Sequence, residues 1–297
     1  MNSAKSKRKE TLMGLIFISP GLLGFIFFIL IPVFASIIVS FTKWNFLQGF
    51  DAMTFVGLRN YIRMFSDDWF LVSYKNNILF TLITVPVLIA IGLIMAEMLN
   101  RYVFGNQAIR IMMFIPYIAS IVAVAAVWQV IFHPSYGPVN QFLISMGVEN
   151  PPKWFVDYKW SLYTIMIVYI WQQLGYTMIV YIAGLKSVPS ELYEAASIDG
   201  AGPIRQFLYV TVPLVSPTTF FLTIMGIIGS FRVFDHISLL TNGGPGNSSS
   251  VMAFYIYRKA FDDFQVGYAN ALAWALFVLI FIVTLIQFKF QSKFTNE

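Results

Sequence analysis

Few side chains in this sequence are of the types that catalyse reactions. The chain has no cysteine, which excludes thiolate chemistry, and its two histidines, His133 and His236, lie far apart in the sequence. The glycine-rich stretch NGGPGNSSS, at 242–250, lacks the lysine of a phosphate-binding loop, and we predict a flexible turn that is structural or contacts a partner. We therefore expect no catalytic residue and no metal ligand, so the chain itself is not an enzyme.

One polar, turn-rich segment at 187–214 instead stands out, with three acids, two glycines and three prolines. It reads SVPSELYEAASIDGAGPIRQFLYVTVPL and lies between two long apolar stretches. The whole chain has 297 residues, of which 58% are hydrophobic and 11% charged. Soluble domains carry about 25% charged residues, so the composition indicates an integral membrane protein. The net charge is +5, but the basic residues are scattered over short loops and do not indicate a nucleic-acid partner.

Six stretches are long and apolar enough to cross a bilayer, which takes about 20 residues in a helix. The first is overlong and contains Pro20 and Pro32, so we expect it to be kinked or tilted and to act as an uncleaved anchor. The predicted fold is an all-α integral membrane protein with six transmembrane helices. The predicted spans are 12–41, 78–99, 109–132, 162–185, 214–231 and 269–288.

An even number of spans places both termini on the same side of the membrane. The basic N-terminal tail, MNSAKSKRKE, predicts that this side is the cytoplasm. The loops at about 42–77, 133–161 and 232–268 then lie outside, where TKWNF and PPKWFVDYKW indicate interfacial aromatic belts or contacts with a soluble partner. The segment at 187–214 becomes a cytoplasmic loop between the fourth and fifth spans.

That loop is expected to contain two short helices. Ser190 suits an N-cap position and Glu191 and Glu194 suit the first turn of a helix, where acids complement the helix dipole. Gly200 suits the left-handed residue that ends such a helix. Pro203 suits the first position of a second helix.

One face of the first short helix suits a protein partner. It carries Leu192, Ala195, Ala196 and Asp199, at helical spacing, and its alanines permit a close approach. A helix lying on anionic lipid would carry basic residues, whereas the polar residues here are acidic. We therefore expect the loop to dock on another protein.

The loop also resembles the EAA loop of permeases from binding-protein-dependent ABC importers. The motif is Glu-Ala-Ala, three residues, Gly, nine residues, an aliphatic, one residue, an aliphatic, then Pro; here it reads Glu194-Ala195-Ala196, Gly200, Val210, Val212 and Pro213. Valines stand where Ile and Leu are commoner. Further stretches, such as LLTNGGPGNSSSVMAFYIYRKAF and VGYANALAWALF, are similar to the carbohydrate-uptake branch, and NGGPGNSS to its maltose- and glycerol-phosphate-type first permease.

The resemblance implies a division of the chain and a set of docking residues. It implies a permease core at 75–290 with the EAA loop at 187–213, preceded by an N-tail, first span and outer loop at 1–74 and followed by a cytoplasmic tail at 291–297. In the family the EAA helix is a coupling helix seated on the ATPase subunit. The implied coupling residues are Glu191, Glu194, Ala195, Ala196, Asp199, Gly200 and Ala201.

The implied partners are a second permease subunit, two ATPase subunits, an extracytoplasmic solute-binding protein, a carbohydrate-type solute and the lipid of a bacterial-type inner membrane. ATP and Mg²⁺ would be bound by the ATPase subunits, and no cofactor by this chain. The chain has no Gly-x4-Gly-Lys-Ser/Thr motif. Uptake against a ten-thousandfold gradient needs about 5.5 kcal/mol, so the energy must enter through the cytoplasmic loop.

Three alternatives remain open at this point. The same architecture could import a non-carbohydrate solute such as a polyol phosphate, or the chain could be a structural membrane protein. An ion-coupled carrier would place acids or histidines near mid-membrane, whereas Glu97, Arg232 and Asp235 lie near the predicted span ends.

The solute pathway is predicted from polar residues that share helical faces in the fourth and fifth spans. Such residues can line a lumen, although small and polar residues also join helices without any solute. The candidates are Tyr169, Gln172, Gln173, Tyr176, Thr219, Thr223, Gly226 and Ser230.

Overall fold

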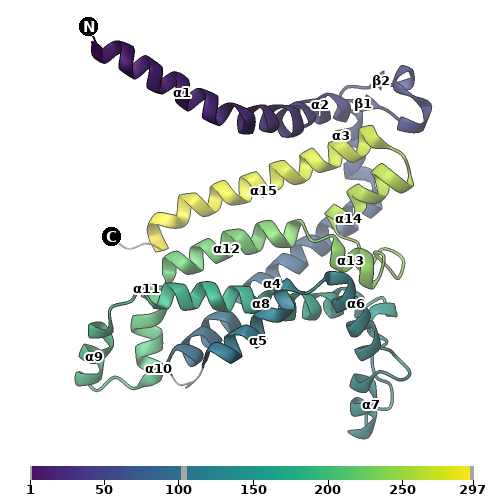
Figure 1. The fold of residues 1–297 in the computed structure, drawn as a ribbon. Helices are drawn as coiled ribbons and strands as arrows, with labels where there is room; N and C mark the ends of the chain where they lie inside the picture. The colour runs from purple at the N-terminus through teal and green to yellow at the C-terminus, as the bar shows by residue number, and fades with distance from the viewer. Residues whose placement is uncertain (1, 102–105, 295–297) are drawn as a thin grey trace. The chain divides into compact units, whose positions relative to one another are not determined.

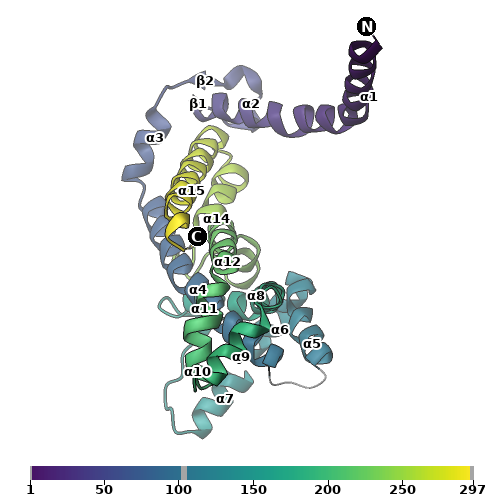
Figure 2. The same ribbon diagram turned by 90° about the vertical axis from the view of Figure 1, so that its left-hand side faces the viewer.

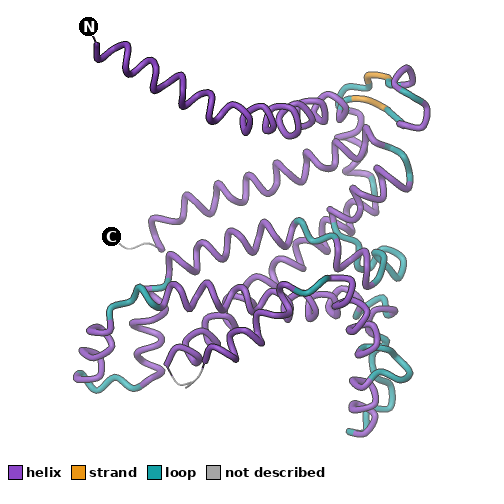
Figure 3. The backbone as a smooth tube through the Cα atoms, viewed as in Figure 1, coloured by secondary structure: helices purple, strands orange, loops and turns teal. Residues whose placement is uncertain are grey.

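The chain is almost entirely helical (Figure 1, Figure 3). A computed structural model describes residues 2–101 and 106–294, so the last residues of the predicted C-tail, 295–297, lie outside the described part. The fold divides into two compact units. The first consists of Met1–Ser66 and Ile256–Ala275, and the second of Asp67–Tyr255 and Leu276–Glu297. The predicted permease core at 75–290 remains a prediction.

The first unit contains the N-terminal span and the short elements that follow it. Its elements up to residue 66 are α1 (Asn2–Phe25), a π-helical turn (Ile26–Leu30), α2 (Ile31–Ser40), β1 (Thr42–Lys43), β2 (Thr54–Phe55) and α3 (Arg59–Arg63), with 3₁₀ turns at Phe46–Gln48, Phe50–Ala52 and Met64–Ser66. After α14 (Met252–Tyr257) come a π-helical turn (Arg258–Asp262) and α15 (Val266–Phe294), which continues into the second unit.

The irregularity in the first span follows from Pro32. Pro32 has no N–H to donate to the carbonyl of Phe28, four residues earlier. The chain widens into the π-helical turn just before it, where the Ile31 N–H bonds to the Ile26 carbonyl. Apolar side chains along this span are exposed in the chain, as lipid-facing residues are, with Phe17 85% accessible.

The C-terminal end of the first span is fixed by a small hairpin and by Asn60. Strands β1 and β2 pair antiparallel. The buried Asn60 amide donates to the carbonyls of Ser40 (2.8 Å) and Thr42 (2.9 Å). The backbone leaving the span therefore has its hydrogen bonds satisfied.

The second unit contains the middle spans. Its elements are α4 (Asp68–Arg101), α5 (Asn106–Ile118), α6 (Ile121–Ile131), α7 (Pro138–Ser145), a 3₁₀ turn (Trp154–Val156), α8 (Ser161–Leu185), α9 (Ser190–Ile198), α10 (Pro203–Gln206), a π-helical turn (Phe207–Thr211), α11 (Val212–Leu214), α12 (Ser216–Phe231) and α13 (Asp235–Leu240).

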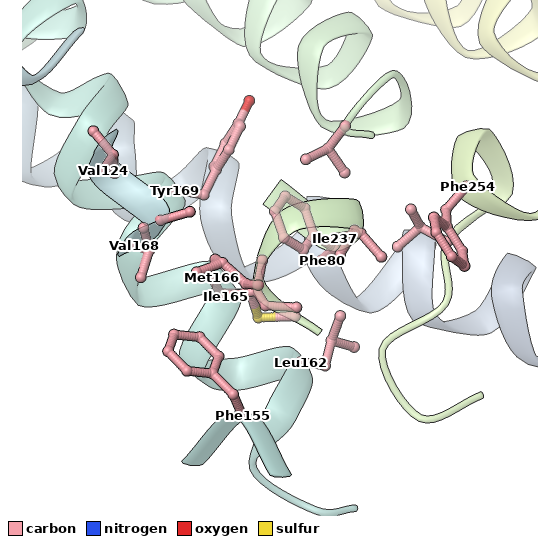
Figure 4. Packing of buried hydrophobic residues seen from close by; sticks show 14 of the residues in the cluster. Phe80, Val124, Phe155, Leu162, Ile165, Met166, Val168, Tyr169, Ile237 and Phe254 are labelled. Atoms are coloured by element: carbon pink, nitrogen blue, oxygen red, sulfur yellow. The ribbon is translucent and has the colours of Figure 1, made fainter. Parts of the chain in front are cut away.

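Helices α4, α8 and α12 pack on one another and form the framework of this unit (Figure 1, Figure 2). Buried residues of α4, α6 and α8 and of the segment after α12 form one apolar cluster (Figure 4). Phe80, Ile165 and Ile237 in this cluster are completely buried. The cluster holds α13 and the Trp154–Val156 turn against the ends of the spans.

The predicted third span is not a straight helix. It consists of α5 and α6, which are bent by 97° at Ala119 and Ser120. Figure 1 shows α5 beside α8, where the two backbones approach closely at Gly175: a Cβ there would lie 2.0 Å from the Met113 carbonyl oxygen. The chain turns three residues after Pro116, whose missing N–H weakens the helix at that point.

The predicted fifth span is also jointed. Helix α12 covers most of the predicted range. The Pro203–Leu214 segment before it is also helical, and the two are bent by 67° at Val215. Within the described residues, four helices are long and apolar enough to cross a membrane, and the count reaches six if each bent pair is one span. The structure therefore confirms the all-α class and supports six spans.

Candidate functional site

The predicted coupling helix is present as α9, and its end is a complete Schellman motif. Gly200 has φ +77°, as predicted for the residue that ends the helix. The Ala201 N–H bonds to the Ala196 carbonyl (2.9 Å) and the Gly200 N–H to the Ser197 carbonyl (3.0 Å). The N-cap prediction was wrong: Pro189 precedes the helix, and Ser190 is its first residue. Pro189 has φ −61° and ψ 131°, which is extended backbone, so the helix begins with the residue after it.

One side of α9 is exposed. Glu191, Glu194, Ala195 and Asp199 all lie on the surface, together with Gly200. Ala196 and Ala201 are half-buried against the rest of the loop. The sequence interpretation missed the most prominent apolar side chain of the helix, which is Ile198, 86% accessible. Its position three residues after Ala195 was a signal that could have found it.

The opposite side of α9 is fastened to the end of α4. The Arg101 guanidinium carbon lies 4.3 Å from the centre of the Tyr193 ring, which is a cation–π contact. The Tyr193 hydroxyl is 3.0 Å from the Thr211 hydroxyl, at the start of the fifth span. One side chain of α9 thus contacts two different spans.

Gln206 makes the second connection. It is buried, and its amide nitrogen donates to the Ser197 hydroxyl (2.9 Å) and to the Ala201 carbonyl (3.0 Å). Its amide oxygen accepts from Arg101 Nη1 at 3.0 Å. Because the nitrogen and the oxygen of this amide are both hydrogen-bonded, Gln206 connects α9, α10 and α4.

Glu97 completes this network, which we call the coupling clamp (Glu97, Arg101, Tyr193, Ser197, Gln206 and Thr211). The Arg101 Nε lies 2.7 Å from Glu97 Oε1, and Thr211 donates to the same oxygen at 3.4 Å. Glu97 is only 7% accessible. A buried carboxylate needs a charged partner, so removing Arg101 would leave Glu97 uncompensated.

The predicted pathway residues of α8 fall into two groups. Tyr169 and Gln172 are buried, and Gln172 Oε1 accepts from His236 Nε2 at 2.7 Å. Burial lowers the pKa of His236 to about 4, so this histidine is neutral near pH 7. Gln173 and Tyr176 are half-buried, and Tyr176 stacks on Tyr117 with 5.0 Å between ring centres.

The predicted pathway residues of α12 also divide. Thr219 and Thr223 line a cavity of about 400 Å³ between α12 and α15, with Ser216, Phe220 and Gln287. The Thr219 hydroxyl accepts from Tyr181 at 3.0 Å. Gly226 and Ser230, in contrast, lie at helix-packing contacts.

Those packing contacts are made with α4. A Cβ at Gly226 would lie 3.3 Å from Val85, and the completely buried Ser230 hydroxyl is 2.8 Å from the Thr81 hydroxyl. In this conformation Gly226 and Ser230 join helices, as small and polar residues do in membranes. The eight predicted residues therefore do not form one continuous lining.

The glycine-rich segment at 242–250 forms turns, as predicted, and its hydrogen bonds to α4 favour the structural role. The Asn76 amide donates to the carbonyls of Asn247 (3.3 Å), Ser248 (3.0 Å) and Ser250 (2.9 Å). Ser73 bonds Ser250 at 2.8 Å. Because the three serines at 248–250 are buried and bonded, the segment is a fixed structural element of the second unit.

Metal chemistry finds no support in the described part of the chain, where no group of three or more His, Cys, Asp or Glu could hold an ion. His133 stacks on Tyr136 in a turn, with 3.6 Å between the ring centres. The other histidine, His236, lies on α13, within the predicted connection at 232–268 between the last two spans.

Comparison with known proteins agrees with this arrangement. The model of the family "Binding-protein-dependent transport system inner membrane component" matches residues 88–296. The chain is 35% identical to the probable ABC transporter permease protein YesP of Bacillus subtilis (strain 168), over 100% of this chain and 96% of that protein.

Two further relatives have names that state a solute. The sulfoquinovosyl glycerol transport system permease protein SmoG of Agrobacterium fabrum (strain C58) is 32% identical, over 94% of this chain and 90% of that protein. The sn-glycerol-3-phosphate transport system permease protein UgpA of Yersinia enterocolitica is 29% identical, over 84% and 86%.

A solved structure has the same fold. One chain of a bacterial alginate ABC transporter, crystallised with an alginate pentasaccharide-bound periplasmic protein, superimposes with a TM-score of 0.85 at 22% identity. The superposition covers 100% of this chain and 99% of that chain.

Proposed function

Because the chain belongs to the family of binding-protein-dependent transport system inner membrane components, we propose that it is one transmembrane subunit of an ATP-driven importer of a sugar, an oligosaccharide or a sugar derivative. The name of the Agrobacterium relative, which matches nearly the whole chain, supports this solute class. The sequence motifs of the carbohydrate-uptake branch support it as well.

The single observation that carries the mechanism is the two-sided arrangement of α9. Its exposed side presents Glu194, Ala195 and Ile198 to a partner, whereas Tyr193 and Ser197 fasten its other side to the spans. The sequence has no nucleotide-binding loop, so the partner on the exposed side is the ATPase subunit. ATP and Mg²⁺ belong to that subunit.

The transport step follows from this arrangement. ATP binding closes the two ATPase subunits and moves α9 as a rigid body. The coupling clamp passes the displacement to α4 through Arg101 and to the fifth span through Gln206 and Thr211. Both spans then tilt together, and the pathway opens to the other side of the membrane.

The remaining parts of the complex complete the pathway. A second, similar permease lies against this subunit, and a solute-binding protein delivers the solute from outside. Both chain termini are cytoplasmic, which puts α9 on the ATPase side. We assign the solute pathway to Gln173, Tyr176, Thr219 and Thr223, which are partly exposed in the single chain, with Tyr169, Gln172, Gly226 and Ser230 supporting the helices around it.

Site-directed cross-linking tests the docking of α9. The sequence has no cysteine, so Ile198→Cys introduces a single thiol that can carry a benzophenone group. We expect it to cross-link to the ATPase subunit in the assembled complex. The matched control is Ser145→Cys on α7, another exposed position, which should give no such product. Equal cross-linking at both positions would contradict the assignment.

A polyol phosphate is the second candidate solute, favoured by the name of the Yersinia relative. A thermal-shift screen of the cognate binding protein against carbohydrates and glycerol phosphate separates the two. The solute that stabilises the binding protein should also raise the ATPase rate of the complex. If no carbohydrate does either, the sugar assignment is wrong while the ATPase coupling of α9 still stands.

A further inference from the structure

The first unit contains a cationic pocket that has no role in the mechanism above. Its volume is about 670 Å³, and it lies between the hairpin that follows α2 and the start of α15. Among the side chains that line it are Lys43, Trp44, Arg59, Arg63, Asp263 and Tyr268. We call it the interfacial pocket.

The base of the interfacial pocket is rigid. Gly267, at the start of α15, approaches the hairpin so closely that a Cβ there would lie 2.0 Å from the Thr42 carbonyl oxygen. The Gly267 N–H also bonds to the Trp44 carbonyl at 3.4 Å. The buried Asn60 fixes the backbone on the other side. The charged side chains are therefore held on a preformed frame.

The pocket lies at the level of a membrane surface. The first span ends at Ser40, and the last begins at Val266. The two spans contact each other through Trp274 Nε1, which donates to Ser36 Oγ at 3.0 Å. Residues immediately beyond these ends therefore lie at the headgroups, whichever side of the membrane this is. Trp44 and Tyr268 are the residue types that favour this level.

The charge of the pocket is positive. Lys43 and Arg59 form no ion pair with the described residues, and both are exposed. Arg63 lies over the Tyr268 ring at 4.2 Å and donates to Gln265 Oε1 at 2.9 Å, which orients its guanidinium. Asp263 opposes them, but Lys259 already neutralises it at 2.7 Å. The pocket thus has the positive charges of Lys43, Arg59 and Arg63, whereas the carboxylate of Asp263 is already neutralised by Lys259.

We propose that the interfacial pocket binds the phosphate of an anionic phospholipid headgroup. Arginine and lysine side chains donate to phosphate oxygens, and basic residues beside a membrane attract anionic lipid. The volume accommodates a phosphoglycerol group, with Trp44 against its glycerol portion. Bound lipid would hold the ends of the first and last spans together.

Native mass spectrometry of the full chain from nanodiscs tests this proposal. The test variant is Lys43→Gln/Arg59→Gln, and the control is Lys153→Gln/Lys159→Gln, which changes the net charge equally at residues that do not line the pocket. In nanodiscs containing phosphatidylglycerol, we expect the test variant to bind the lipid at least about tenfold more weakly than wild type. The control should bind as wild type does. Equal retention of the lipid by both variants would overturn the proposal.

Two further arms identify the source of the phosphate. Phosphatidylcholine nanodiscs should yield no retained lipid. Inorganic phosphate should not compete with phosphatidylglycerol, because a free anion lacks the membrane anchor. If inorganic phosphate displaces the lipid, or raises the Tm of wild type but not of the test variant, the site is for free phosphate and the lipid assignment is overturned.

Discussion

The Arg101 guanidinium lies 4.3 Å from the centre of the Tyr193 ring, and it is held there by Glu97 at 2.7 Å. Arg101 is the last residue of α4, whereas Tyr193 belongs to the exposed coupling helix. A cation–π contact of this kind contributes about 0.5–2 kcal/mol. It makes the short helix a rigid extension of a membrane span.

Replacing Tyr193 should therefore separate ATP hydrolysis from transport. Tyr193→Leu removes both the ring and the bond to Thr211, whereas Tyr193→Phe keeps the ring over Arg101. We expect the leucine variant to hydrolyse ATP in proteoliposomes while importing several-fold less solute per ATP. The phenylalanine variant should be much closer to wild type. Unchanged coupling in the leucine variant would show that the clamp does not transmit force.

Gly200→Pro should abolish uptake without preventing membrane insertion. Proline fixes φ near −65°, whereas Gly200 has φ +77°, and the substitution also removes the N–H that bonds to Ser197. The turn after α9 would be lost, and the docking surface with it. Uptake assays and membrane fractionation measure the two effects.

The matched control for that substitution is Gly202→Ala. Gly202 has φ −70°, and no heavy atom lies within 4 Å of a Cβ there. We expect near-normal uptake. Normal uptake by Gly200→Pro itself would rule out the assigned role of the turn.

Gly175→Ala should destabilise the second unit. The new methyl would meet the Met113 carbonyl at 2.0 Å, so α5 and α8 would have to move apart. Overpacking of this kind costs about 1–3 kcal/mol. We expect a lower Tm of the purified protein. Gly21→Ala, where a Cβ meets nothing within 4 Å, should leave Tm unchanged or raise it slightly.

Acidification should destabilise the folded chain through His236. Its pKa is about 4 when folded, against an ordinary value of 6.5. Between pH 4 and pH 6.5, His236 is protonated in the unfolded chain and neutral in the folded chain. The contribution of the neutral imidazole to the free energy of unfolding is therefore complete above pH 6.5 and declines as the pH falls towards 4. The loss at pH 5 is about 2 kcal/mol. Between pH 7 and pH 5, Tm should fall less in His236→Gln than in wild type. An equal fall of Tm in both would refute the lowered pKa of His236.

Much of the coupling loop could be predicted from sequence because its features are local. Gly200 and Pro203 determine their own backbone conformation, so the end of α9 and the start of α10 follow from the sequence. The clamp could not be predicted in this way. Arg101 and Gln206 lie more than a hundred positions apart, and only the packing of α4 beside the loop brings them within 3.0 Å.

Two features were not predicted, for a related reason. Hydropathy detects an apolar run at 109–132 but not its direction, so the bend between α5 and α6 was missed, although Pro116 was a signal. The stretch at 242–250 was expected to be flexible from its glycines. Its rigidity comes from Asn76 and Ser73, which belong to a distant helix.

The joint at Val215 has a mechanical consequence. Val215 is 1% accessible, with φ −90° and ψ 8°, and it separates Pro203–Leu214 from α12. A displacement of the Pro203–Leu214 segment can be absorbed as rotation about this pivot. Helix α12 is bonded to α4 at Ser230 and would follow α4, so the angle between the two parts of the bent pair could change during the proposed transport step.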